Sequence, residues 1–413
     1  MKFRINLYLL IVLLLAGYFV KSQPIAQWRG LNRDGIYKES DLLKMWPAEG
    51  PKLLWETEAL GCGYGSLVVF DNTLYINGEV DSVSYLFAFD VKGNLRWKTP
   101  NGREFFGDGF SSSYPGGRST PTVYNGLVYV CSGLGRIACI NAETGKEIWS
   151  KHMVDNLGGA PNYFGFSESL LVDENYVYGY IGGKESNVIC LDRLTGNVVW
   201  TSTALSQNAA FCSPIMITLP DRKLFVTISK DHLFALDAKD GKLLWSVKED
   251  SLKFDDEYCC NTPIYSDGYI YSISGVEKGT GTIELKLSPD GTSVQEVWRN
   301  GNLKNIMGGF ILADNKLYAT SRDKKLKCIE TASGAIVDTV RSISGALIYA
   351  DNQLYCYGDN GNMNLIGLNG SKMELISKFK IKDGTKEHLA HPVISNGVLY
   401  IRYGNALMAY QIK

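Results

Sequence analysis

Two adjacent cysteines, Cys259 and Cys260, are the sharpest local feature of this 413-residue sequence. Adjacent cysteines in an exported protein can form a strained vicinal disulfide, a bond with a raised reduction potential. The acidic residues 255–257 precede the pair and Asn261 follows it, so oxygen ligands of the kind that calcium prefers are close by. The alternative is two small buried thiols, because cysteine packs as a small apolar residue.

Further polar side chains are candidates for a binding site because each precedes the first strand of a predicted repeat. These candidates are Arg118, Glu168, Asn261, His388 and His391. Polar groups that converge from different repeats on one channel mouth are the default hypothesis for a site. Ordinary solvated loop residues are the alternative. Hydrolase or lyase chemistry through Glu168 and a channel histidine is a further option, whereas zinc is not favoured because no third ligand is evident.

The stretch from Thr120 to Trp149 defines the repeat that must position these residues. It contains short runs rich in Val, Ile and Tyr, separated by turn residues such as Asn125-Gly126 and Gly133. This pattern predicts three or four short antiparallel strands joined by tight turns. A meander of this size cannot bury both of its faces, so it needs neighbours of its own kind.

Two signatures show how often the repeat occurs. A turn that leads into an aromatic residue occurs eight times, at Tyr75, Tyr129, Tyr178, Phe225, Tyr271, Tyr318, Tyr355 and Tyr400. A glycine followed by a tryptophan marks the outer strand, and the tryptophans expected to dock one blade on another are Trp55, Trp97, Trp149, Trp200, Trp245 and Trp298. Their spacing is typical of four-stranded propeller blades. The sequence therefore predicts an all-β, eight-bladed β-propeller of four-stranded antiparallel blades.

The two ends of the chain complement one another. The last repeat ends at Lys413 without its outer strand, and an orphan strand of that type, residues 52–55, precedes the first repeat. We expect the N-terminal strand to complete the eighth blade and close the ring. The predicted organisation is a lead-in segment over residues 23–51, which packs across the ring, and a propeller over residues 52–413. Trp28 and Trp46 of the lead-in are expected in the core, with ligand binding as the alternative.

Residues 1–22 are interpreted as a signal peptide, because Lys2 and Arg4 precede an apolar run and Ser22 suits cleavage before residue 23. A membrane anchor is the alternative, but no stop-transfer pattern follows. We therefore expect a periplasmic or secreted protein with no stable membrane span once the signal is removed. The net charge is -1 and basic runs are absent, so nucleic acid is not an expected partner. We expect a monomer that binds an unknown small molecule or an envelope protein.

Most other cysteines have a packing explanation. Cys139, Cys190 and Cys328 occupy one slot of the repeat, where other blades carry Ala88 and Ala235. That slot requires a small apolar side chain, and cysteine behaves as one. The total of nine cysteines is odd, so the sequence implies no disulfide framework.

The repeats over residues 142–149 (AETGKEIW) and 192–200 (DRLTGNVVW) resemble the tryptophan-docking repeats of quinoprotein-type eight-bladed propellers. Together with the lead-in sequence QWRGLNRDG at residues 27–35, they make the whole mature chain resemble exported bacterial proteins known as pyrroloquinoline-quinone-like β-propeller repeat proteins. One branch of that superfamily comprises quinone-dependent alcohol dehydrogenases. The other comprises non-catalytic propellers, such as a subunit of the outer-membrane β-barrel assembly machinery. The resemblance implies the fold more strongly than the function, because the repeated residues dock blades.

The resemblance implies two functional hypotheses. In quinone-dependent methanol dehydrogenases a vicinal cysteine pair stacks on the cofactor, so one hypothesis is a calcium- and pyrroloquinoline-quinone-dependent alcohol or sugar dehydrogenase. Cys259 and Cys260 would lie against the quinone, with Glu168 and Asn261 as calcium ligands or base. Those enzymes are longer, and their full calcium-ligand set has no clear counterpart here. The favoured hypothesis is a non-catalytic binding or scaffold module with its ligand or partner at one mouth of the axial channel.

Overall fold

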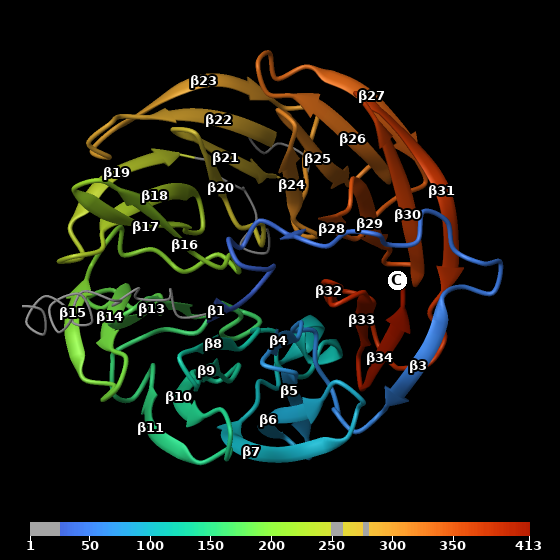
Figure 1. Ribbon diagram of the computed structural model, residues 1–413. Helices are drawn as coiled ribbons and strands as arrows, with labels where there is room; N and C mark the ends of the chain where they lie inside the picture. Colours follow the sequence, from blue (N-terminus) through green and yellow to red (C-terminus); the bar gives the residue numbers. More distant parts are fainter. Residues whose placement is uncertain (1–24, 249–258, 276–280) are drawn as a thin grey trace, which may run out of the picture.

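The computed structural model describes residues 25–248, 259–275 and 281–413. Eight sheets stand around a common axis (Figure 1), and each contains an antiparallel four-stranded blade. The predicted eight-bladed, all-β propeller is therefore confirmed. The predicted signal peptide, residues 1–22, lies outside the described residues. In the described part of the chain, no helix combines the length and the apolar character needed to cross a bilayer.

Each blade runs from an inner strand at the axis to an outer strand at the perimeter of the ring. Blades 1 to 4 comprise β4 (Val68–Phe70), β5 (Thr73–Val80), β6 (Val83–Asp90) and β7 (Leu95–Arg103); β8 (Thr122–Tyr124), β9 (Leu127–Cys131), β10 (Arg136–Asn141) and β11 (Glu147–His152); β12 (Leu171–Val172), β13 (Tyr176–Tyr180), β14 (Val188–Asp192) and β15 (Val198–Ser202); and β16 (Ile215–Leu219), β17 (Arg222–Ile228), β18 (His232–Asp237) and β19 (Leu243–Lys248).

The second half of the ring follows the same plan. Blades 5 to 8 comprise β20 (Ile264–Ser266), β21 (Tyr269–Ser274), β22 (Gly281–Leu287) and β23 (Val294–Asn300); β24 (Phe310–Ala313), β25 (Lys316–Ser321), β26 (Lys325–Glu330) and β27 (Ile336–Arg341); β28 (Ala346–Ala350), β29 (Gln353–Tyr357), β30 (Asn362–Asn369) and β31 (Lys372–Lys380); and β32 (Val393–Ser395), β33 (Val398–Tyr403) and β34 (Ala406–Gln411). The eighth blade needs one more strand.

That missing strand is β3 (Lys52–Thr57), which pairs with β34 in the sheet order β3-β34-β33-β32. Trp55 lies opposite Ala409, and Leu53 lies opposite Tyr410. In Figure 1 the blue β3 lies beside the red β34. The predicted closure of the ring by the N-terminal strand is thus confirmed, and it pairs the edge that β34 would otherwise expose.

The recurrent turn between the first two strands of a blade explains the aromatic signature. Asn125 and Gly126 join β8 to β9 with φ values of 49° and 73°. A two-residue hairpin with both residues in the left-handed region suits the twist of the flanking strands, and Asn-Gly adopts it at low cost. The strand after the turn then buries its aromatic residue between blades, as Tyr129 does.

Outer-strand tryptophans pack on the glycine turn of the next blade. A Cβ atom on Gly196 would lie 2.6 Å from the Trp149 ring, so that ring requires a glycine beneath it. The indole N–H of Trp149 donates to the carbonyl of Arg193 at 2.9 Å. The same contact joins Trp55 to Gly93, Trp97 to Gly145, Trp200 to Gly241 and Trp298 to Gly334. These contacts link consecutive blades around most of the ring.

The contact between blades 4 and 5 departs from this pattern. Gly291 faces Leu219 and Leu224 instead of Trp245. The indole N–H of Trp245 is buried and has no hydrogen-bond partner among the described residues. The packing of blade 5 on blade 4 therefore uses leucine side chains instead of the tryptophan that the repeat predicts.

The lead-in segment crosses the axis of the ring. Strand β1 (Ile25–Ala26) pairs antiparallel with β8, and β2 (Ile36–Tyr37) pairs parallel with β28. Residues 25–37, which we call the plug, therefore span from blade 2 to blade 7 (Figure 1, dark blue). The rest of the lead-in lies on the outside of blades 7 and 8, where Trp46 is buried with its ring 5.0 Å from that of Phe379.

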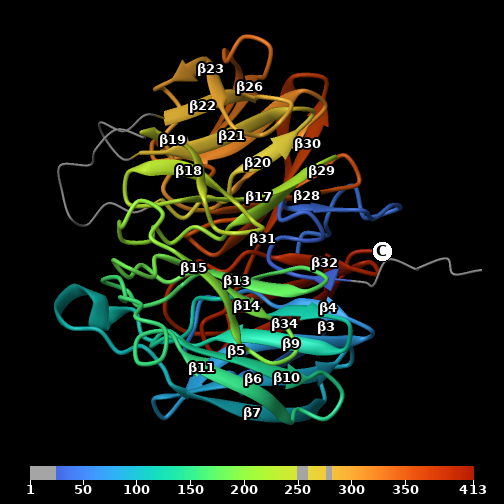
Figure 2. The same ribbon diagram turned by 90° about the vertical axis from the view of Figure 1, so that its left-hand side faces the viewer.

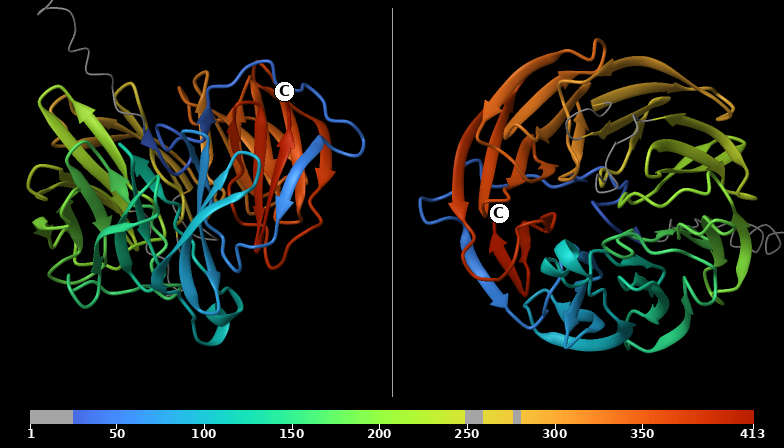
Figure 3. Two further views of the ribbon diagram at one scale, coloured as in Figure 1. Left: turned by 60° about the horizontal axis from the view of Figure 1, so that its bottom comes forward. Right: turned by 180° about the vertical axis from the view of Figure 1, so that it is seen from behind.

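The two faces of the ring carry different segments. Figures 2 and 3 show the lead-in on one face and the loop after β7 on the other, where it projects with the single-turn 3-10 helix η1 (Gly109–Ser113). We call these the lead-in face and the loop face. The inner strands begin toward the loop face, so the predicted channel-mouth residues belong to that side.

Candidate functional site

Arg29 of the plug is buried at the axis and donates hydrogen bonds to several blades. Its guanidinium reaches the carbonyl of Phe310 at 2.6 Å and that of Leu347 at 3.3 Å. It also donates to the Nδ1 atom of His391 at 3.2 Å. Burial lowers the pKa of Arg29 to about 10, so the guanidinium stays charged at neutral pH. One buried cation thus joins the plug to blades 6, 7 and 8.

Arg33 has the same role on the opposite side of the axis. It donates to the carbonyls of Leu170 at 2.6 Å, Ser169 at 2.9 Å and Pro214 at 3.0 Å. Both arginines adopt positive φ values, 58° at Arg29 and 60° at Arg33, which persist only where surrounding contacts hold them. The plug is therefore fixed to blades on both sides of the channel.

Glu168 and Asn261 are buried beside this plug and are engaged by protein groups. The carboxylate of Glu168 accepts the backbone N–H of Tyr180 at 2.9 Å. Burial raises the pKa of Glu168 to about 8. The side chain of Asn261 donates to two backbone carbonyls, those of Ile273 and Asn305, and accepts the N–H of Gly309 at 3.0 Å. Both side chains thus bond backbone of second strands, and Asn261 also bonds the segment that precedes β24.

The two histidines lie in different surroundings. His391 packs edge-on against Trp28, with ring centroids 4.6 Å apart, and burial lowers its pKa well below the usual value. His388 instead stacks on Tyr403 at 3.8 Å and is hydrogen-bonded to the hydroxyl of Tyr357 at 2.6 Å. The structure thus brings Glu168, Asn261 and His391 to the plug, while His388 lies between blades 7 and 8.

The adjacent cysteines are thiols, as are the other seven. Cys259 is buried and donates to the carbonyl of Ile273 at 3.5 Å. Burial raises the pKa of Cys260 to about 12, which keeps its thiol protonated. The acidic residues 255–257 that suggested calcium ligands lie outside the described residues.

The two described candidates for calcium ligation, Glu168 and Asn261, are already engaged by protein groups. Among the described residues, no cluster of three or more His, Cys, Asp or Glu side chains could hold a metal ion. Glu168 and Asn261, the two candidate ligands, point their polar atoms at backbone groups of the blades. The plug also crosses the axis beside them.

Arg118, the remaining predicted residue, lies at the loop face among aromatic rings. Its guanidinium carbon is 5.6 Å from the ring centroid of Tyr64, and 5.4 Å from those of both Phe105 and Phe164. It also donates to the carbonyls of Gly116 and Tyr114. The three aromatic rings hold the Arg118 guanidinium in place by cation–π attraction. The guanidinium in turn links the loops that carry those rings.

The aromatic cluster continues outward from Arg118. Phe110 lies 5.2 Å from Tyr114 and 6.4 Å from Phe164 between ring centroids. We call the set the aromatic rim, which comprises Tyr64, Phe105, Phe110, Tyr114, Tyr163, Phe164 and Phe211 around Arg118. Phe110 is 64% exposed and Tyr163 is 41% exposed, and Phe106 in the same loop is 68% exposed.

Sequence reasoning identified Arg118 but missed the aromatic residues around it. They lie in the loops between blades, outside the repeat, so no periodic signal marks them. The available signal was local, namely the pairs Phe105-Phe106 and Tyr163-Phe164 in segments otherwise rich in Gly, Ser and Asn.

Comparisons with known proteins agree with this architecture. A family model described as outer membrane protein assembly factor BamB matches residues 48–251. BamB of Shewanella oneidensis is 21% identical over 321 residues, which cover 72% of this chain and 69% of that protein. Tetrathionate hydrolase of Acidithiobacillus ferrooxidans is 26% identical over 247 residues, which cover 52% of this chain and 46% of the hydrolase. The chain thus spans about half the length of that hydrolase.

A solved structure adds evidence on the fold. A europium-containing methanol dehydrogenase is similar with a TM-score of 0.63 at 11% identity, covering 92% of this chain and 90% of that one. At such low identity the likeness concerns the fold alone. The repeats, the closed eight-bladed ring and the family match over residues 48–251 together support a place for this chain among the pyrroloquinoline-quinone-like β-propeller repeat proteins.

Proposed function

We propose that this protein is an exported, non-catalytic binding propeller that docks a protein partner of the cell envelope on its aromatic rim. The observation that carries this proposal is the exposure of Phe110 and Tyr163 in the aromatic cluster around Arg118, with Phe106 also exposed in the loop that carries Phe110. Contiguous exposed apolar side chains are rare on soluble monomers and mark interaction sites. Aromatic residues and arginine are also the side chains enriched where protein interfaces gain most of their energy.

The rim is organised before a partner arrives. Arg118 hydrogen-bonds the backbone of its own loop, and its ring contacts join that loop to the one carrying Phe164. A pre-ordered surface loses less conformational entropy on binding, so more of its contact energy appears as affinity. The names of the matched family and of the relative in Shewanella oneidensis, outer membrane protein assembly factor BamB, support an envelope protein as the partner.

Site-specific photocrosslinking in the native envelope tests this proposal. A photoreactive residue placed at Phe106 should form a discrete crosslinked species with another protein. The matched control is Met45, which is 64% exposed but belongs to the lead-in segment, and which should give no such species. Crosslinks of equal yield from both positions, or none from position 106, would overturn the proposal that the aromatic rim is the docking surface.

The alternative is a calcium- and pyrroloquinoline-quinone-dependent dehydrogenase. It is tested by incubating the purified protein with the quinone and calcium and then measuring dye reduction with primary alcohols and sugars. We expect no substrate-dependent dye reduction, because Glu168 and Asn261 are committed to the backbone of the blades. Turnover that is lost in Cys260→Ser would replace the binding proposal with this one.

A further inference from the structure

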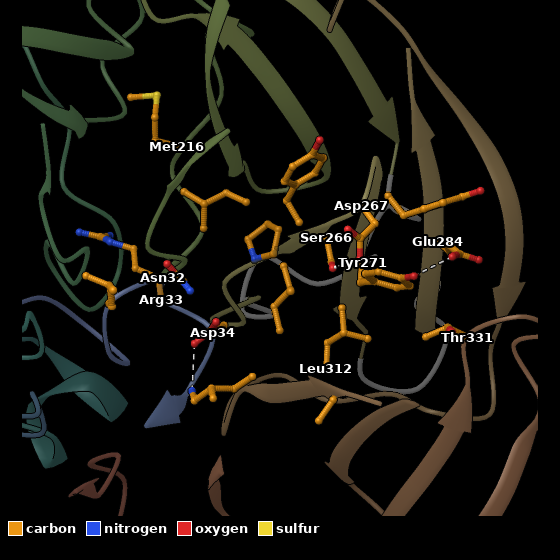
Figure 4. A pocket seen from close by; sticks show the side chains of 18 of the residues that line it. Asn32, Arg33, Asp34, Met216, Ser266, Asp267, Tyr271, Glu284, Leu312 and Thr331 are labelled. Atoms are coloured by element: carbon orange, nitrogen blue, oxygen red, sulfur yellow. Dashed lines mark hydrogen bonds between the residues drawn. The ribbon is translucent and has the colours of Figure 1, made fainter. Parts of the chain in front are cut away.

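A separate cavity of about 950 Å³ opens at the lead-in face, between the plug and the inner strands of blades 3 to 6. Figure 4 shows side chains that line it. Much of its wall is apolar, including Leu31 of the plug, Leu171 of β12, Ile215 of β16 and Leu312 of β24. The aromatic rim lies on the other face, so the cavity is independent of the proposed docking surface.

One wall of this cavity holds a carboxylate where the repeat elsewhere holds a small apolar residue. Glu284 on β22 lies opposite Tyr271, the recurrent aromatic residue of blade 5, and is only 5% exposed. In the other seven blades the residue opposite the aromatic is alanine, cysteine or leucine, namely Ala88, Cys139, Cys190, Leu236, Cys328, Leu365 and Ala409. The blade fold therefore does not require a carboxylate there, and burying one costs free energy.

Tyrosines of blade 5 line the same cavity as this carboxylate. The hydroxyl of Tyr271 donates to Glu284 Oε1 at 2.8 Å, as drawn in Figure 4. Tyr265 and Tyr269 of the same blade also line the cavity, and Asp267 lies in the turn between them. Tyrosine rings attract cations through their faces, and a carboxylate beside them adds direct charge attraction. Blade 5 thus combines three tyrosines and two carboxylates at one cavity.

The net charge of the lining also favours a cation. Its carboxylates are Asp34, Asp267, Glu284 and Asp314, whereas Arg33 is its single basic residue. The guanidinium of Arg33 is directed at Gln27 and at three backbone carbonyls. A concave site lined by charge of one sign concentrates counter-ions of the other. An anionic ligand is therefore disfavoured.

From this arrangement we infer that the cavity binds a small organic ammonium ion with an apolar body. The ammonium group lies beside Glu284 and the tyrosines of blade 5. The apolar part packs against the aliphatic wall formed by the plug and blades 3, 4 and 6. The other blades carry a small or aliphatic residue at the position of Glu284, so the blade fold does not account for the cost of burying this carboxylate. Binding of an ammonium group accounts for it.

Isothermal titration with three probes of equal chain length tests this inference: hexylammonium, hexanol and hexanoate. We expect hexylammonium to bind at least tenfold more tightly than hexanol, and hexanoate to give no measurable binding. Glu284→Gln retains the hydrogen bond with Tyr271 but removes the charge, and it should weaken hexylammonium binding about tenfold. The matched control Glu296→Gln removes an exposed carboxylate of the same blade and should bind as the wild type does.

Equal affinity for the three probes, no binding of hexylammonium, or an unchanged affinity in Glu284→Gln would each overturn the inference. The comparison of probes on the unmodified protein does not depend on any variant folding. Glu284→Ala adds a second check, because it installs the residue that Ala88 and Ala409 provide in other blades. It should keep the melting temperature or raise it while losing the preference for hexylammonium, and a large drop in melting temperature would make Glu284 a structural residue.

Discussion

The centre of the propeller around the plug and the aromatic rim on the loop face have opposite character. Around the plug, Glu168, Asn261 and His391 are buried and directed at protein groups. In the aromatic rim, Phe110 and Tyr163 are exposed and pack against Phe164, which in turn contacts Arg118. The comparison teaches that polar residues before the inner strands stabilise the centre of this ring, whereas the surface available to a partner lies farther out.

The physical reason for the buried region lies in the inner strands. Each inner strand is the edge of its blade, so carbonyl and N–H groups on its axial side need partners. Strands β1 and β2 pair with two of these edges, and the guanidinium groups of Arg29 and Arg33 reach carbonyls on several others. The plug thus meets a hydrogen-bonding requirement that the closed ring creates.

The largest expected effect follows from removing a plug arginine. Arg29→Ala leaves the carbonyls of Phe310 and Leu347 without their donor and opens a void at the axis. We expect the free energy of unfolding to fall by roughly 3–5 kcal/mol, the range for breaking buried charged contacts. Urea denaturation measures this loss. The exposed Arg103→Ala serves as the control and should change stability by no more than about 0.5 kcal/mol; equal midpoints for the two variants would contradict the role of the plug.

A second prediction concerns the pH dependence that Glu168 introduces. Burial raises its folded pKa to about 8, whereas an unfolded glutamate has a pKa of about 4.3. Between these values the folded state holds a proton that the unfolded state has released, so stability falls as the pH rises. The slope for one proton is about 1.4 kcal/mol per pH unit.

Glu168→Gln removes this titration, so the difference in unfolding free energy between wild type and variant should shrink or reverse as the pH rises from 5 toward 8. Below the unfolded pKa the contribution of Glu168 is fully retained, and above the folded pKa the slope disappears. Thermal unfolding of both proteins across this range measures the difference. If the unfolding free energies of wild type and variant changed in parallel with pH, Glu168 would be in contact with solvent. The centre of the ring and the aromatic rim would then no longer differ in burial at this residue.

The sequence predicted the ring far better than its centre. Eight near-copies of one turn and an orphan strand determine the blade count and the closure by β3, because both depend on local pattern. The contacts that Arg29 and Arg33 make with the blades join residues more than 130 positions apart, such as Arg33 and Ser169, and no periodic signal reports them. Glu284 was missed for another reason. It lies six residues before Asp290, whereas Cys139 lies two residues before Asn141, so the equivalent position is shifted in blade 5.

Arg118 lies at the centre of the aromatic rim, and its replacement should have an intermediate effect. Arg118→Lys keeps the charge but loses the planar group that faces Tyr64, Phe105 and Phe164 and donates to two carbonyls. Lysine does not reproduce such stacked, multiply bonded geometry. We expect a loss of about 1–2 kcal/mol in unfolding free energy and a weaker near-UV circular dichroism signal from the rim. Arg322→Lys at an exposed position should leave both measurements unchanged.

The smallest effect on stability, and the sharpest functional effect, is expected at the rim itself. Phe110→Ser removes an exposed ring, so the unfolding free energy should change by no more than about 0.5 kcal/mol. The crosslinked species formed from position 106 should nevertheless disappear, because a rigid aromatic side chain near the centre of an interface contributes strongly to affinity. Leu95→Ser is the matched control, since Leu95 is 50% exposed on the outer strand of the same blade. If Leu95→Ser abolished the crosslink as completely as Phe110→Ser, the partner would bind the outer strand of the blade. The aromatic rim would then not be the specific docking surface.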